Sequence, residues 1–233
     1  MEDSEKLLAC TQCISINKNI RSLTYDECRL LSLAKTRNVY KKGQVIFNES
    51  NHPSGLYCIQ RGMVKIYKLR LDGKEQIVRF AGDGDFIGYR SVLSQEPYRA
   101  SAVAISDTYL CHIPSKSLFE FIEQNPKFAV QLIKNLAENL RDAERRLINI
   151  SSMQAGARVA SAILLLYNKF GVNNKGELNV HLTRKEIGEL ANATTETAIR
   201  EISKLKKEGI INIKGKELIL KKIDKLKEIS EFI

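Results

Sequence analysis

Glu196 and Arg200 are four residues apart in the segment TTETAIREI, a spacing that puts both side chains on one face of a helix. An arginine can donate two hydrogen bonds to O6 and N7 of guanine, and a glutamate can accept one from N4 of cytosine. Thr195 would point outward beside them. This pattern favours a surface that reads DNA bases, and its alternative is an ordinary ion pair on a helix surface.

Two short helices separated by a tight turn are predicted around this pair. Thr183 and Glu186 form a T-x-x-E capping box that starts the first helix. Thr194 caps the second helix. Apolar residues mark the buried side of that second helix: Ala198, Ile202 and Leu205. A basic hairpin at 210–220, turning at 214–216, completes the pattern of a winged helix-turn-helix.

Residues suited to phosphate contacts surround the predicted base readers: Thr183, Thr194, Thr197 and Lys204. Such contacts fix the position of a protein on DNA without specifying sequence. The charge of the chain agrees with this partner, since its formal net charge is +10. The segment 204–227 holds nine lysines and three acidic residues, a net +6 within one short stretch. A basic surface attracts phosphate backbones and speeds association with them.

A different pattern occupies the region from Val39 to about Ile113. Short β-rich segments alternate there with turn signals, at 45–47, 56–59, 63–69, 76–80, 86–88, 100–105 and 108–113. Asp72-Gly73 between two such segments predicts a hairpin. Many closely spaced strands indicate a small barrel or sandwich, which can hold one small ligand or fill itself with side chains.

A long helix is predicted after this region, because Asn125-Pro126 supplies an N-cap and a proline at the first helical position. Apolar residues then follow at alternating spacings of three and four: Ile133, Leu136, Leu140, Ala143, Leu147 and Ile150. This heptad seam favours pairing with a second copy of the chain, and its alternative is packing against the barrel. Ser151-Ser152 is predicted to break the helix and act as a hinge.

Thr24 and Glu27 form another T-x-x-E capping box near the N-terminus, which predicts a helix there.

The domain organisation expected from these patterns has three parts: a sensor barrel at 1–124, a dimerisation helix and hinge at 125–152, and a winged helix-turn-helix domain at 153–233. No apolar run approaches the roughly 18–20 residues of a membrane-spanning helix, and the N-terminus lacks a secretion signal, so a cytoplasmic location is expected. The histidines at 52, 112 and 181 are scattered, and no catalytic triad, H-E-x-x-H motif or phosphate loop is present, so an enzyme is not expected. A regulatory subunit without DNA binding would lack the reading helix and the wing.

Over nearly its whole length the chain resembles the cyclic-AMP receptor protein and fumarate–nitrate regulator (Crp/Fnr) family of transcription regulators. The matching segments are 41–50, 56–67, 72–88, the heptad helix and 182–211. The resemblance implies an α+β fold with a cyclic-nucleotide-binding-type jelly-roll barrel. It also implies a homodimer on double-stranded DNA with a two-fold-symmetric site, and RNA polymerase as a partner. It puts Glu196 and Arg200 at base-reading positions, whereas Thr195 and Ile199 stand where relatives differ.

The effector implied by the resemblance is less definite. Relatives that bind cyclic AMP carry a glutamate for the ribose after the GDFIG-like turn, and then an Arg-Ser pair for the phosphate. Here Gly88 is followed by Tyr89, Arg99 keeps the arginine position, and Ser101 stands one residue beyond the serine position. Losing the carboxylate removes a charged hydrogen bond worth roughly 1.5–3 kcal/mol. Cyclic AMP bound in its usual mode is therefore not expected. The two alternatives for Arg99 are that it binds another anion and that it is an ordinary surface residue.

The cysteines suggest other signals, since an intracellular chain keeps its five thiols reduced: Cys10, Cys13, Cys28, Cys58 and Cys111. The oxygen-sensing branch of the family binds an iron–sulfur cluster, and Cys10, Cys13 and Cys111 resemble three of its ligands. A cluster normally needs four thiolates, so Cys28 would have to complete the set. A reactive pair at Cys10 and Cys13 and structurally silent cysteines are alternatives. Haem on His52 or His112 is less favoured, and the cofactor stays unidentified.

Overall fold

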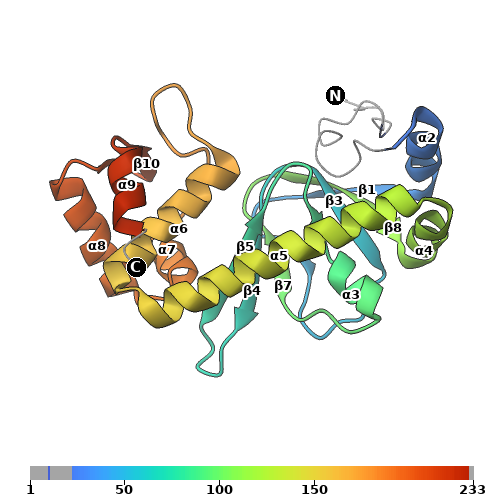
Figure 1. Ribbon diagram of the computed structural model, residues 1–233, viewed down its shortest axis with the longest axis horizontal. Coiled ribbons are helices and arrows are strands. Elements are labelled where there is room, and N and C mark those ends of the chain that lie inside the picture. Colours follow the sequence, from blue (N-terminus) through green and yellow to red (C-terminus); the bar gives the residue numbers. More distant parts are fainter. Residues whose placement is uncertain (1–9, 11–22, 231–233) are drawn as a thin grey trace. The chain divides into compact units, whose positions relative to one another are not determined.

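The computed structural model describes residue 10 and residues 23–230. The described residues divide into two compact units. The first unit holds those up to 68 together with 78–140, and the second holds 69–77 together with those from 141 onward. Helix α5 (Pro126–Ser152) runs through the boundary at residue 140, so the two units share one continuous helix (Figure 1).

The strands of the first domain form two four-stranded antiparallel sheets (Figure 1). The first sheet, in the order β1-β8-β3-β6, contains β1 (Thr36–Tyr40), β8 (Thr108–Pro114), β3 (Gly55–Arg61) and β6 (Phe86–Ile87). The second sheet, in the order β2-β7-β4-β5, contains β2 (Val45–Phe47), β7 (Ser101–Ala104), β4 (Val64–Leu69) and β5 (Glu75–Ala81). The predicted jelly-roll is confirmed as a pair of sheets rather than one closed barrel.

Side chains from both sheets fill the space between them. Phe47 and Tyr98 stack with their ring centroids 4.0 Å apart, and Tyr57 lies 5.9 Å from Phe47 by the same measure. Aliphatic residues complete this core: Ile46, Ile59, Val64, Ile66, Ala81, Ile87, Ala102 and Leu110. These residues form one continuous hydrophobic core between the sheets.

A second core lies on the other face of the first sheet. Residues alternate along a strand, so Leu56 and Cys58 of β3 face this core while Tyr57 and Ile59 face the space between the sheets. Helices cover it: α2 (Tyr25–Ala34), α3 (Tyr89–Ser94), α4 (Ser115–Gln124) and the first turns of α5. Their contributions include Leu31, Val92, Leu118, Phe121, Phe128 and Leu132.

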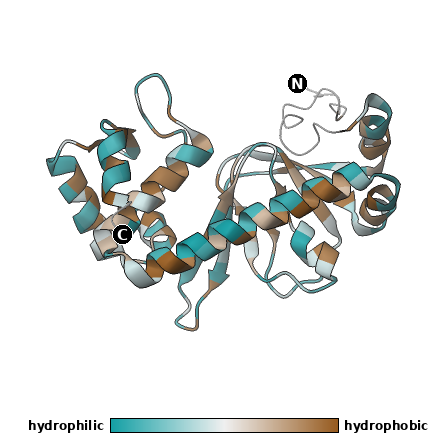
Figure 2. Cartoon of the chain, in the orientation of Figure 1, coloured by the Kyte–Doolittle hydropathy of each residue, from teal (hydrophilic) through white to brown (hydrophobic). Residues whose placement is uncertain are grey.

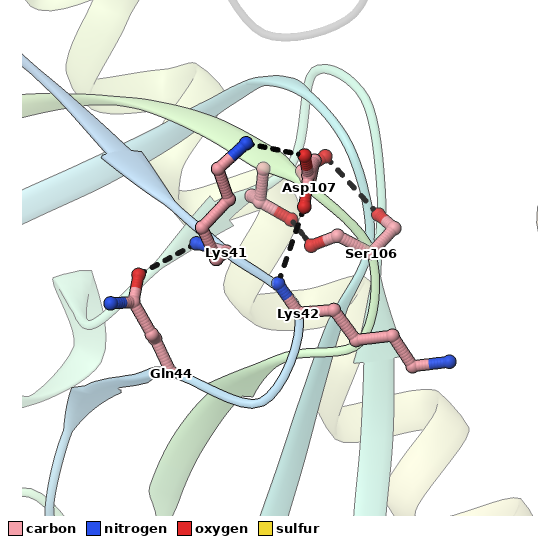
Figure 3. Close-up of polar contacts among 6 residues, drawn as sticks. Lys41, Lys42, Gln44, Ser106 and Asp107 are labelled. Carbon is pink, nitrogen blue, oxygen red and sulfur yellow. Dashed lines mark hydrogen bonds and ion pairs between the residues drawn. The ribbon is translucent and has the colours of Figure 1, made fainter.

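Asp107 fastens the turn between β1 and β2 onto the turn between β7 and β8 (Figure 3). Its carboxylate lies 2.8 Å from Nζ of Lys41 and accepts a hydrogen bond from the Lys42 backbone at 3.4 Å. The backbone N–H of Lys41 donates to Oε1 of Gln44 at 2.6 Å, which closes the first turn on itself. The hydrogen bond from Lys41 lowers the pKa of Asp107.

Capping groups start the helices where the sequence predicts them. Thr24 and Glu27 form a complete capping box at the start of α2. The side chain of Asn125 accepts a hydrogen bond from the Phe128 backbone at 3.1 Å, which caps α5. Both predicted caps are confirmed. Caps can be predicted from sequence because their residues lie only three apart in the chain.

The helix break predicted at Ser151-Ser152 is wrong by one or two residues. Helix α5 continues through Ser152, and the chain leaves the helix at Met153 and Gln154. Both serine hydroxyls donate back to the carbonyl of Ile148, at 2.9 and 2.6 Å. A serine that bonds one turn back in this way is accommodated within a helix and does not end it.

The second domain contains four helices and a two-stranded wing among its described residues. They are α6 (Ala155–Phe170), α7 (Arg184–Leu190), α8 (Thr195–Lys207), β9 (Ile211–Lys214), β10 (Glu217–Leu220) and α9 (Ile223–Ser230). The segment 178–181, which precedes α7, forms no strand. Leu178 makes only an isolated bridge with Val172, and Asn179 then bonds to the Phe170 carbonyl at 3.0 Å, which bends the chain away.

Candidate nucleic-acid interface and sensor site

The turn between α7 and α8 is fixed by side chains at both helix starts. Thr183 Oγ1 accepts from the Glu186 backbone at 3.1 Å, and Glu186 accepts from the Thr183 backbone at 2.8 Å. Thr194 Oγ1 accepts from the Thr197 backbone at 3.2 Å. At Gly188 a Cβ atom would meet the Ala193 carbonyl at 3.0 Å, so glycine allows the two helices to approach. This is the helix-turn-helix that the sequence predicts.

Helix α8 has a buried face and an exposed face as predicted. Ala198, Ile202 and Leu205 are buried, whereas Glu196, Ile199, Arg200 and Lys204 are exposed and Thr195 is half-buried. Arg200 makes its ion pair with the adjacent Glu201, at 3.2 Å, and not with Glu196. The alternative of a Glu196–Arg200 surface pair therefore loses its support. Hydrogen bonds from its own backbone N–H and from Thr194 lower the pKa of Glu196, which keeps this carboxylate charged.

Arg158 on α6 holds the helix-turn-helix in place, a role that the sequence did not reveal. Its guanidinium donates to three backbone carbonyls: Met153 at 2.7 Å, Ala191 at 3.1 Å and Asn192 at 3.3 Å. These carbonyls belong to the turn before α6 and to the end of α7. The partners lie 5 to 34 residues away in sequence, so a lone arginine at a helix start gives no local signal of this clamp.

The wing turns at Gly215, whose φ of 59° lies in the left-handed region that suits glycine. Its strands pair in the register Glu217 to Lys214 and Leu220 to Ile211. Lys214 and Lys216 beside the turn are exposed. The wing therefore presents positive charge at its tip, as the sequence predicts.

In the first domain, which we call the sensor domain, Gly88 and Tyr89 lie at the start of α3. Gly88 has a φ of 77°, and a Cβ there would lie 3.3 Å from the Tyr98 ring. Tyr89 is buried, and its hydroxyl accepts a hydrogen bond from Nδ2 of Asn139 on α5 at 2.7 Å. Burial raises the pKa of Tyr89, so the phenol stays neutral. The position that carries a carboxylate in cyclic-AMP-binding relatives thus holds a neutral group bonded to the long helix.

The other two predicted effector residues already have protein partners. Arg99 is exposed and pairs with Glu96 at 3.2 Å. Ser101 is buried on β7, and its hydroxyl accepts from the Glu49 backbone at 2.9 Å. With the filled interior and the phenol of Tyr89, these contacts do not fit a cyclic nucleotide held in the usual mode.

Four cysteines lie in the core beneath the helices, all buried and with free thiols: Cys10, Cys28, Cys58 and Cys111. Cys58 and Cys111 are direct cross-strand partners on β3 and β8. Cys13 lies outside the described residues. Among the residues that the structure describes, no three His, Cys, Asp or Glu side chains gather closely enough to hold a metal ion. Cys10, Cys28 and Cys111 therefore do not form such a group among themselves.

The histidines considered for haem differ in their surroundings. His112 is half-buried on β8, where its Nε2 shares a hydrogen bond with the Ser54 hydroxyl at 3.1 Å and its ring lies 4.8 Å from that of Tyr57. His52 is exposed.

Every helix in the described part of the chain is too short or too polar to cross a membrane.

Together, a β-sandwich domain, one long connecting helix and a winged helix-turn-helix define a two-domain DNA-binding regulator. Two family models match the chain: the cyclic nucleotide-binding domain over residues 37–125 and the Crp-like helix-turn-helix domain over 157–229. The chain belongs to the Crp/Fnr family of transcription regulators.

Named relatives agree with this assignment. Electron transport regulator A of Shewanella oneidensis is 29% identical over 214 residues, covering 90% of this chain and 83% of the relative. A CRP-like cAMP-activated global transcriptional regulator of Mycobacterium tuberculosis is 29% identical over 189 residues, covering 80% and 84%. The solved structure of FixK2 from Bradyrhizobium japonicum matches with a TM-score of 0.76 and 28% identity, covering 85% of this chain and 98% of FixK2. The chain is similar to transcription regulators and not to enzymes.

Proposed function

We propose that the chain acts as a homodimer that recognises a two-fold-symmetric site in double-stranded DNA and thereby controls RNA polymerase. The observation that carries this proposal is the exposed face of α8. Glu196 and Arg200 are exposed on it without a mutual ion pair, and Arg200 would exchange its surface pair with Glu201 for a base edge. Thr195 lies beside them as a third base contact. We assign the surrounding groups to phosphates: Thr183, Thr194, Thr197 and Lys204.

The homodimer is supported by the apolar seam on α5. Apolar residues recur along this helix (Figure 2). Leu140 and Leu147 are 61% and 69% exposed, and Ile133 is 62% exposed, although all three are large and apolar. A heptad seam of this kind becomes buried when an identical helix pairs with it. Pairing presents two copies of α8, which would span half-sites about 34–36 Å apart.

The base-reading role is tested by selecting the preferred site from randomised DNA and then measuring affinity for that site and for scrambled DNA. Arg200→Ala should weaken binding to the selected site by about 1–3 kcal/mol and relax the choice at one base pair per half-site. Arg29→Ala is the matched control, because Arg29 is an exposed arginine on α2. If Arg200→Ala discriminated among sequences as the unaltered chain does, the assignment of α8 would be wrong.

The dimer is tested by sedimentation of Leu140→Glu. A buried carboxylate at a pairing seam is costly, so this variant should shift to monomers at concentrations at which the unaltered chain sediments as a dimer. Leu33→Glu is the control, since Leu33 is 77% exposed on α2 and lies outside the seam. Equal dissociation of both variants, or a monomeric unaltered chain, would contradict pairing through α5.

We further propose that the signal enters the segment 1–124 and passes through the helix of 125–152 to the DNA-binding segment 153–233. The contact between Tyr89 and Asn139 supports this route, because it joins α3 to α5 directly. Gly88, Tyr89, Arg99 and Ser101 remain the proposed effector contacts, with Arg99 released from Glu96 to meet an anion. Because the partner is DNA, we place the regulator in the cytoplasm.

Arg99→Ala should abolish any change in DNA affinity that an anionic effector causes, while leaving DNA binding without effector unchanged.

A further inference from the structure

Cys10, Cys28 and Lys35 are connected through hydrogen bonds at helix α2. The Cys10 backbone donates to Oγ of Ser32 at 2.8 Å, and that hydroxyl donates to the Cys28 carbonyl at 2.7 Å. Nζ of Lys35 donates to Sγ of Cys10 at 3.2 Å. Lys35 is 7% exposed and both cysteines are buried. Residue 10 is therefore held against α2 beside Cys28, with a buried cation on its sulfur.

We propose that Cys10 and Cys28 are a redox-active thiol pair that closes to a disulfide when the protein meets a peroxide, with Lys35 holding the attacking sulfur. Cys10 is the attacking residue because the Lys35 ammonium group donates a hydrogen bond to its sulfur and so holds that sulfur in place. Cys28 is the resolving residue. The inference does not require the proposed DNA recognition, since it concerns the chemistry of the sensor domain alone.

The reaction has two steps. The Cys10 thiolate attacks one oxygen of hydrogen peroxide, the O–O bond breaks, and the hydroxide that leaves takes up a proton to become water. This gives a sulfenic acid at Cys10. The Cys28 sulfur then attacks the Cys10 sulfur, the S–O bond breaks, and the second oxygen leaves as water with the thiol proton. Each sulfur has lost one electron and the peroxide has gained two.

The surroundings of Cys28 suit a resolving thiol. Burial raises the pKa of Cys28, and electrostatic interactions with Cys10 and Glu27 raise it further, while Lys35 opposes them. The Cys28 thiol therefore keeps its proton, and this is the proton that leaves with the second oxygen. Cys10 and Cys28 also belong to one cluster of buried residues in this core.

A second pair in the same core, Cys58 and Cys111, provides an internal comparison. These residues face each other across β3 and β8 and are equally buried. Their positions are fixed by a continuous strand ladder, whereas Cys10 is attached to α2 through a side-chain hydrogen bond. A disulfide at Cys10–Cys28 would add a covalent link between residue 10 and the helix that covers β8.

The test is to treat the full-length reduced protein with hydrogen peroxide, block the remaining thiols by alkylation, and map the cysteines by mass spectrometry. We expect one intramolecular Cys10–Cys28 disulfide that dithiothreitol reverses. Failure to form a disulfide, or one joining Cys10 to Cys13 or Cys58 to Cys111, would overturn the proposal. DNA affinity of the reduced protein is measured separately, so a failure of DNA recognition is distinguished from a failure of the thiol pair.

The part played by Lys35 is tested with Lys35→Met. Disulfide formation should be about tenfold slower in this variant, because the attacking species loses its cation. Lys35→Arg should restore most of the rate. Lys65→Met is the control, since Lys65 is a similarly buried lysine that lies over the Tyr67 ring, 5.2 Å from its centroid. Circular dichroism before oxidation verifies that each variant is folded, and an unchanged rate in folded Lys35→Met would remove the lysine from the mechanism.

Discussion

The DNA-binding domain and the sensor domain use their polar side chains in opposite ways. In the former, Glu196, Arg200 and Lys204 extend from a helix whose start and turn are fixed by backbone and capping contacts. In the latter, Tyr89 and Ser101 are buried and bonded within the protein. The proposed recognition surface therefore lies on a helix that caps hold in place, while Tyr89 and Ser101 of the proposed effector site already have internal partners. An effector that acts at these positions has to displace or modify the internal contacts before it can change the structure.

The largest effect is expected at Arg158, whose guanidinium supports the DNA-binding domain by donating to three backbone carbonyls. Arg158→Ala should lower the free energy of unfolding of this domain by about 2–4 kcal/mol, since a charged donor is lost and carbonyls are left unpaired. Urea unfolding followed by circular dichroism measures it, with Lys206→Ala, an exposed change on α8, as the control. A loss equal to that of the control would show that capping alone holds the turn.

The internal contact of the sensor is tested with Tyr89→Phe, which removes only the hydroxyl bonded to Asn139. We expect a loss of about 1 kcal/mol in the free energy of unfolding. We also expect a change in DNA affinity, although Tyr89 is remote in sequence from α8. Tyr25→Phe on α2 is the control, because Tyr25 is exposed. Unchanged DNA affinity in a destabilised Tyr89→Phe would separate this contact from signalling.

A smaller effect is expected at Lys204, which is proposed to contact phosphate. Lys204→Ala should weaken binding to selected and scrambled DNA alike. For a dimer it should reduce the slope of log affinity against log salt by roughly 1.8, or about 0.9 for each lost phosphate contact. Titrations at several salt concentrations, with Lys116→Ala on α4 as the control, measure this. Loss of affinity for the selected site alone would make Lys204 a base reader.

The smallest effect concerns the turn held by Asp107. Because the folded-state pKa of Asp107 is lowered by Lys41, its contribution to stability is present above the ordinary aspartate value of about 3.9 and is lost as pH falls through the folded value. Asp107→Asn should therefore be slightly less stable than the unaltered chain at pH 7, and this difference should shrink as the pH falls below about 3.9. Thermal unfolding across this range tests the sign, and an equal difference at every pH would contradict it.

Local signals in the sequence predicted the DNA-binding domain well. Thr183 with Glu186, and Thr194 alone, form the caps that their spacing indicated. The exposed face of α8 follows from a period of 3.6 residues, which any helix of this sequence would show. The recognition surface was legible because its geometry depends on residues within one or two turns of each other.

Contacts between distant residues could not be read in the same way. The bond between Tyr89 and Asn139 joins residues 50 apart in sequence, and that between Cys10 and Lys35 joins residues 25 apart. β1 was largely missed because it is an edge strand with little burial, and it is defined by its pairing with β8. The break at Ser151-Ser152 was misplaced because a serine can bond within a helix as well as end it.

The continuity of α5 has a consequence for how this chain tolerates changes in length. The helix is buried near Phe128 and Leu132 in the sensor domain and continues without a break to Ser152. One residue inserted in its exposed middle would turn everything beyond it by about 100° and lengthen it by about 1.5 Å. Seven inserted residues would restore nearly the original phase with about 10 Å of added length. In a continuous helix of this kind, each added residue therefore changes the angle between the two ends of the helix far more than it changes the distance between them.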